Sequence, residues 1–117
     1  MKKKTNKDQQ ENYLERKPKR HEAIAWAKDE KGIVTLDIEN TGFFNRLAQK
    51  LFHKPKVTHI HLDEMGSFVW PIMDGEKDII AIGKEVEEQF GEKANPLYER
   101  LAKFFQVLDS YHFITWN

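Results

Sequence analysis

Residues 57–72, VTHIHLDEMGSFVWPI, change from a strand pattern to a helix pattern within a few positions, and this junction decides the fold. Residues 57–62 are rich in β-branched side chains, which favour an extended strand. Asp63 follows where the N-cap of a helix belongs, and Glu64 lies in the first turn, where the helix dipole favours a negative charge. The stretch therefore predicts a strand that leads directly into an amphipathic helix.

The helix after Asp63 is expected to end soon. Pro71 has no backbone N–H to donate, so we expect Trp70 to be the last residue with regular helical geometry. Asp74 and Gly75 then form a turn, with Gly75 suited to the left-handed conformation that often ends a helix. The residues predicted to face the core are Met65, Phe68, Val69 and Ile72.

The residues before the junction predict two more strands and a short helix. Residues 24–27 and 33–38 have extended patterns and are separated by a turn at 29–32, which indicates a β-hairpin. At 43–52, large apolar residues recur at helical spacing, and Pro55 ends the element. The basic edge of this helix suits a membrane surface or an acidic partner, but we expect the helix to cover an open end of the core.

Two further helices follow the first one. Asp78 is placed to cap the second helix and Gly91 to close it. Gly83, inside that helix, is expected to allow close approach of a neighbouring helix. Asn95 as N-cap and Pro96 at the first helical position mark the start of the third helix.

These elements predict an α+β fold of winged-helix-like architecture, with a three-stranded antiparallel sheet packed on three C-terminal helices. The short helix before the third strand is an addition, and residues 111–116 return as an extended segment. A chain of 117 residues supports one core. We assign the folded domain to residues 21–117. Residues 1–20 carry eight basic and three acidic side chains, and we expect them to form a disordered charged tail.

Charge and cysteine content limit the function classes. Lys plus Arg and Asp plus Glu both number 19, so no overall field attracts nucleic acid or an anionic membrane. The absence of cysteine excludes disulfides and thiolate metal sites and agrees with a cytoplasmic location. No apolar run has the length of a membrane span.

The sequence shows no catalytic constellation. His59 and His61 share one face of a strand, but two imidazoles are too few for a metal site. Ser67 and Ser110 are the only serines, and neither lies on a glycine-rich elbow. No phosphate-binding loop is present. We therefore expect no enzyme activity, no metal and no cofactor.

The third helix has a wide apolar arc. Tyr98 and Phe105 lie on one flank of its core stripe when residues are placed 100° apart. They either border an apolar groove beside a sheet edge or thicken the core, and their positions alone leave both alternatives open. The core stripe itself consists of Leu97, Leu101, Phe104 and Leu108.

A sheet followed by three helices also suits a winged-helix DNA-binding regulator. The helix at residues 78–90 carries one Lys against four acidic residues, however, and phosphate contacts normally dominate DNA affinity. A structural subunit of an enzyme complex, without a peptide of its own, is the other alternative.

One ordered string of motifs resembles the PqqD-like proteins. It starts with LDEMGSFVW at 62–70 and Asp74-Gly75, and continues with IIAIGKEV at 79–86 and Phe90-Gly91. The resemblance ends with the apolar residues Leu101, Phe105, Leu108, Phe113 and Ile114.

The resemblance implies a non-catalytic peptide chaperone, or recognition element, for ribosomally made and post-translationally modified peptides. Such a protein captures the leader of the precursor as an added strand on the third strand of the sheet, against the third helix. It then presents the peptide to a modifying enzyme, often a radical S-adenosylmethionine protein. The peptide-binding residues implied here are Val57, Thr58, His59, Ile60 and His61 on the strand edge, with Tyr98, Leu101 and Phe105 as the wall.

An exposed strand edge satisfies the main-chain groups of a guest peptide, and pockets beside it select alternate side chains. The same edge is compatible with a monomer or a homodimer. We expect a precursor other than that of a quinone cofactor, and no nucleic acid or membrane partner.

Overall fold

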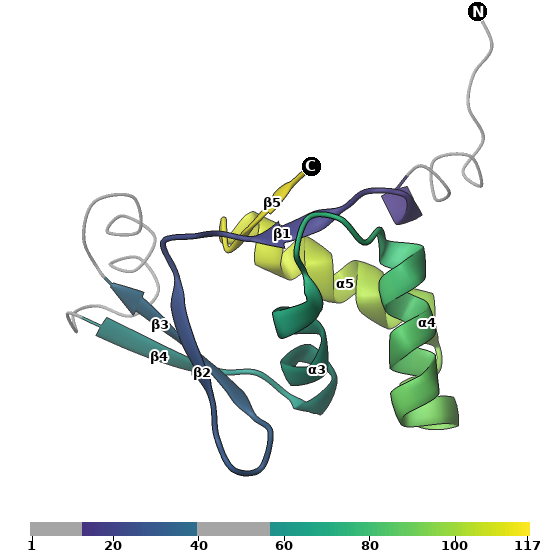
Figure 1. Cartoon of the computed structure of the whole chain (residues 1–117), viewed down its shortest axis with the longest axis horizontal. Helices are drawn as coiled ribbons and strands as arrows, with labels where there is room; N and C mark the ends of the chain where they lie inside the picture. The colour runs from purple at the N-terminus through teal and green to yellow at the C-terminus, as the bar shows by residue number, and fades with distance from the viewer. Residues whose placement is uncertain (1–12, 40–56) are drawn as a thin grey trace, which may run out of the picture.

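The computed structural model describes residues 13–39 and 57–117. They form the predicted α+β fold, with a three-stranded antiparallel sheet at one end and the helices beside it (Figure 1). The helix expected at residues 43–52 lies outside the described residues. The elements are β1 (Pro18–Arg20), β2 (Ala25–Lys28), β3 (Val34–Glu39), β4 (Val57–His61), α3 (Glu64–Ile72), α4 (Ile79–Phe90), the 3₁₀ helix η2 (Gly91–Ala94), α5 (Leu97–Ser110) and β5 (Ile114–Trp116).

The sheet has the strand order β2-β3-β4, with both pairs antiparallel. In the central strand, Val34, Leu36 and Ile38 are buried and the residues between them face the other side. Leu36 lies opposite Trp26 on β2 and opposite Ile60 on β4. One face of all three strands is therefore directed at the core, as the period-2 pattern of the sequence requires.

The strand-to-helix junction is built as predicted. The Asp63 carboxylate caps α3 by accepting a hydrogen bond of 2.7 Å from the Gly66 amide. One turn into the helix, the buried hydroxyl of Ser67 accepts a hydrogen bond of 2.8 Å from the Val34 amide of the central strand. This side chain ties the helix to the sheet by satisfying a backbone donor inside the core.

Helix α3 continues through Pro71 to Ile72, so the prediction that it ends at Trp70 is wrong. The last carbonyls of a helix lack intrahelical partners. Here the side chain of Arg20 provides the missing donors. Its Nη1 lies 3.2 Å from the Trp70 oxygen, 2.6 Å from the Pro71 oxygen and 3.0 Å from the Met73 oxygen. A cation at this end also complements the helix dipole.

The predicted cap and close contact of α4 are confirmed. The Asp78 carboxylate accepts a hydrogen bond of 2.8 Å from the Ala81 amide. A Cβ atom added at Gly83 would lie 2.6 Å from the Tyr98 ring of α5. The absence of a side chain at this position allows α4 and α5 to pack closely.

The predicted start of α5 is wrong by one residue. The helix begins at Leu97 with Pro96 in the cap position, and no side chain caps it. Asn95 instead ends η2, where its amide donates to the Glu92 oxygen at 3.1 Å. This 3₁₀ helix was not predicted, and the residue expected to cap α5, Asn95, is the one that follows its last residue.

The prediction of a disordered tail at residues 1–20 is wrong for its last residues, which belong to a second, two-stranded sheet. Residues 18–20 pair antiparallel with β5, so Pro18 lies opposite Trp116 and Arg20 opposite Ile114. Nearby, the Arg16 guanidinium lies 4.1 Å from the centre of the Trp116 ring. Residues 13–20 are therefore part of the packed structure, because they cover apolar groups at the C-terminal end. Residues 1–12 lie outside the described residues.

Candidate functional site

β4 is an edge strand of the sheet in the part of the chain that the structure describes. The Leu62 amide donates to the Val34 oxygen at 2.9 Å, just beyond the end of β4. In an antiparallel pair the direction of the backbone groups alternates along the strand. The N–H and C=O groups of Thr58 and Ile60 therefore face β3, and those of Val57, His59 and His61 face the open edge.

The outer face of β4 carries two cross-strand histidine pairs. Nδ1 of His59 lies 2.6 Å from a carboxylate oxygen of Asp37, and Nδ1 of His61 lies 2.7 Å from the Thr35 hydroxyl. Both imidazoles are thus fixed to the central strand on the solvent side. Val57, on the same face, is 38% exposed.

The inner face of β4 is half-closed. Thr58 and Ile60 lie opposite the buried residues Ile38 and Leu36. Ile60 is only partly buried, and the buried hydroxyl of Thr58 has no hydrogen-bond partner among the described residues. This side of the edge thus presents a partly exposed apolar side chain, that of Ile60.

The three α5 residues that were predicted to form the wall of the peptide site lie in the core or against α4. Leu101 and Phe105 are completely buried in the core, and Phe105 packs against Trp116 with ring centres 6.2 Å apart. Tyr98 packs on Gly83 of α4, where burial, and the charges of Glu87 and Asp78, raise the pKa of its phenol. A docked peptide cannot touch Leu101 or Phe105 in this arrangement.

The opposite flank of α5 approaches the end of β4. A Cβ atom at Gly66 would lie 2.9 Å from the Phe104 ring and 3.4 Å from the Leu62 Cβ atom, so both residues adjoin the start of α3. Phe104 is partly buried, and Val107, one turn along, is 43% exposed. Tyr111 follows at the same side of the helix and is also partly buried. Phe104, Val107 and Tyr111 thus share one partly exposed flank of α5, and Phe104 on this flank adjoins Leu62 at the end of β4.

Hydrophobic periodicity alone could not decide between the two flanks of α5, and the resemblance supplied the predicted wall residues. At 100° per residue, Tyr98 and Phe104 lie on opposite sides of the stripe that is buried in the structure. That stripe consists of Leu97, Leu101, Phe105 and Leu108. The pattern fixes which residues are apolar but contains no information on which flank meets the sheet. The close packing of α4 on Tyr98 decides it.

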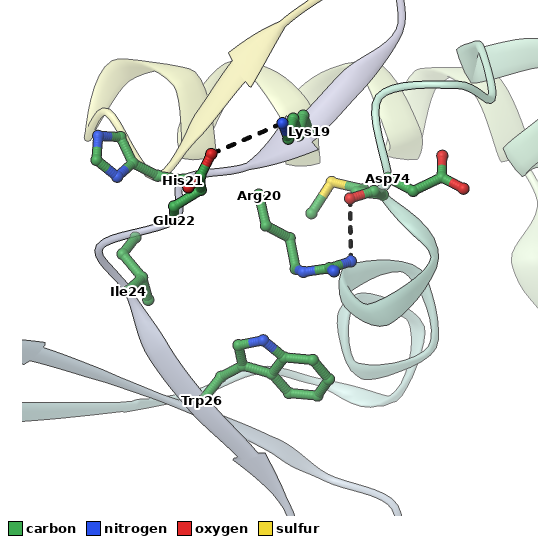
Figure 2. A pocket seen from close by; sticks show the side chains of 8 residues that line it. Lys19, Arg20, His21, Glu22, Ile24, Trp26 and Asp74 are labelled. Atoms are coloured by element: carbon green, nitrogen blue, oxygen red, sulfur yellow. Dashed lines mark hydrogen bonds and ion pairs between the residues drawn. The ribbon is translucent and has the colours of Figure 1, made fainter.

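A separate cavity of about 330 Å³ lies between β1, β2 and the end of α3. Figure 2 shows Arg20 reaching from β1 to the last turn of α3, above the indole of Trp26. The guanidinium carbon is 5.6 Å from the centre of the Trp26 ring. The lining residues are Lys19, Arg20, His21, Glu22, Ile24, Trp26, Met73 and Asp74.

The described residues offer no metal centre, because no three of their His, Asp or Glu side chains come together as ligands. Within the same ranges no helix has the length and apolar character needed to cross a membrane. The main features of the surface are thus the open edge of β4, its flanking apolar residues and the cavity beside Arg20.

The chain matches a known protein family. A family model described as Coenzyme PQQ synthesis protein D (PqqD) matches residues 32–114, which is more than half of the chain. No curated protein and no solved structure matches the chain. The matched range covers β3, β4 and all the helices from α3 onward, whereas β1, β2 and the residues from Lys19 to Trp26 precede it.

Proposed function

The chain belongs to the PqqD family, and from this premise we propose that it is a non-catalytic peptide-binding chaperone of ribosomally synthesised precursor peptides. It captures the leader segment of the precursor as an added strand on β4. It then presents the peptide to a modifying enzyme, of the radical S-adenosylmethionine type, in the cytoplasm.

The open edge of β4 is the observation that carries the proposal. Val57, His59 and His61 direct their N–H and C=O groups away from β3, and no described strand pairs with them. Unpaired edges of this kind are templates for another chain. A leader that adds as a strand satisfies these groups and orders itself at the same time.

Apolar side chains next to the edge supply the selectivity. A guest strand beside β4 alternates its side chains between the two faces of the sheet. On the inner face they meet Ile60 and, from α5, Phe104 and Val107, which are all at least partly exposed. The leader is therefore expected to carry apolar residues at alternate positions.

Leader capture is tested by isothermal titration of the full chain. The probes are synthetic leaders from short reading frames that neighbour its gene, and the control is the remainder of each precursor without its leader. We expect one leader to bind and its leaderless counterpart to give no heat. Equal binding of the two, or no binding by any of the leaders, contradicts the proposal.

A further inference from the structure

The cavity between β1, β2 and α3 contains a cation that no acid of the described residues neutralises. The ion pairs involve Lys19 with Glu22 and Lys77 with Asp74 and Glu85, besides the pair on the sheet. Arg20 takes part in none of them. Within residues 13–39 and 57–117, its charge is balanced only by carbonyl dipoles at the end of α3.

The guanidinium of Arg20 is held in place with part of its donors unused. Its hydrogen bonds to the described residues are all made by Nη1. An arginine side chain has five N–H donors in a planar fork, so those on Nε and Nη2 have no partner among the described residues. Figure 2 shows Nη1 against α3 and the rest of the group on the side of Ile24 and Trp26. A fixed fork of this kind matches the two oxygens of a carboxylate.

The second open edge of the sheet lies beside this cavity. β2 has β3 as its only neighbour in the described sheet. The Asp29 amide donates to the Ile33 oxygen at the hairpin end, so alternation directs Ala25 and Ala27 to β3 and the backbone groups of Trp26 and Lys28 outward. The Trp26 ring lies on the same side of the sheet as the buried Leu36, under Arg20.

We propose that this cavity binds an acidic side chain of a protein partner whose extended segment pairs with β2. The segment takes its main-chain hydrogen bonds from Trp26 and Lys28. An Asp or Glu side chain on its inner face passes the Trp26 ring and pairs with the free donors of Arg20. Aromatic and arginine side chains in such pockets commonly dominate binding energy at interfaces.

The identity of the partner rests on the proposed function. With the leader on β4, the β2 edge stays free for the modifying enzyme, so both can be held at once on opposite edges of one sheet. The residues from Lys19 to Trp26 precede the part of the chain that matches the family model. Six of the eight lining residues thus precede the matched segment, whereas Met73 and Asp74 lie within it.

Two short peptides test the inference on the unmodified protein. They are Ac-TVTETVT-amide and its glutamine counterpart Ac-TVTQTVT-amide, each titrated to millimolar concentration against the isotope-labelled full chain and followed by NMR. We expect the glutamate peptide to shift the Trp26 indole N–H, the Arg20 side chain and the Lys28 amide. The glutamine peptide should bind about tenfold or more weakly, since it lacks the charge-assisted pair.

The variant Arg20→Gln should abolish the difference between the two peptides. Because Arg20 also caps α3, circular dichroism must show that the variant is folded. The comparison of the two peptides on the unmodified chain does not depend on this variant. Equal binding of both peptides, shifts restricted to β4, or no shift at Trp26 and Lys28 overturns the inference. The inference is also overturned if acetate reproduces the Arg20 shift and the glutamate peptide does not, because the site then binds a small carboxylate. Failure here leaves leader binding to β4 unaffected, so the two proposals can fail separately.

Discussion

Replacing His59 by proline removes one backbone N–H from the open edge of β4 and leaves the hydrogen bonds between β3 and β4 in place. The His59 amide points away from β3, whereas the neighbouring groups of Thr58 and Ile60 hold the strand pair together. Proline is tolerated in edge strands where its missing N–H faces outward. The fold should therefore persist while the docking edge loses one donor.

The expected loss follows from that single hydrogen bond. A leader carbonyl left unpaired at the edge costs about 1–3 kcal/mol, which corresponds to a Kd about 5- to 150-fold weaker. The matched control His59→Thr loses the same imidazole and its 2.6 Å contact to Asp37 but keeps the N–H. Titration calorimetry with the leader compares the two variants, and urea unfolding shows that both are folded. Equal affinity of the proline and threonine variants refutes strand addition at this edge.

Three further substitutions test the packing and the wall. Gly83→Ala should destabilise the fold by about 1–3 kcal/mol, because the added Cβ atom would lie within 3 Å of Tyr98. In a double-mutant cycle measured by urea unfolding, Tyr98→Ala should recover part of this loss. Full additivity of the two substitutions contradicts the contact. Ser67→Ala leaves the buried Val34 amide without its partner and should cost about 1–3 kcal/mol in the same assay, whereas an unchanged stability means that the amide finds another acceptor. Val107→Ser should weaken leader binding several-fold with little change in stability, since this side chain is 43% exposed, and an unchanged Kd removes it from the wall.

Local signals in the sequence were sufficient for most of the fold. Asp63 and Asp78 cap helices as predicted, since an N-cap depends on a few adjacent residues. The alternating pattern of β3 and the close approach at Gly83 were also readable, because each depends on one short segment. The same holds for the three-stranded sheet, whose strands all carried their own pattern.

The features that sequence analysis missed depend on contacts between distant segments. Residues 18–20 are too polar to predict a strand, and they form one because β5 offers its edge. Helix α3 continues past Pro71, and Arg20, far away in sequence, binds the carbonyl oxygens of Trp70 and Pro71 at its end. The flank of α5 that faces the sheet is set by the packing of Tyr98 on α4, which periodicity does not encode.

The central claim is that a leader peptide completes the sheet at β4, and hydrogen exchange at single amides tests it most directly. Without a leader, the amides of His59 and His61 face solvent and should exchange quickly, while those of Thr58 and Ile60 are bonded to β3 and exchange slowly. Saturation with the leader should slow exchange at His59 and His61 and leave Thr58 and Ile60 nearly unchanged. If a leader binds and the exchange of His59 and His61 stays fast, the peptide is held elsewhere and the account is wrong.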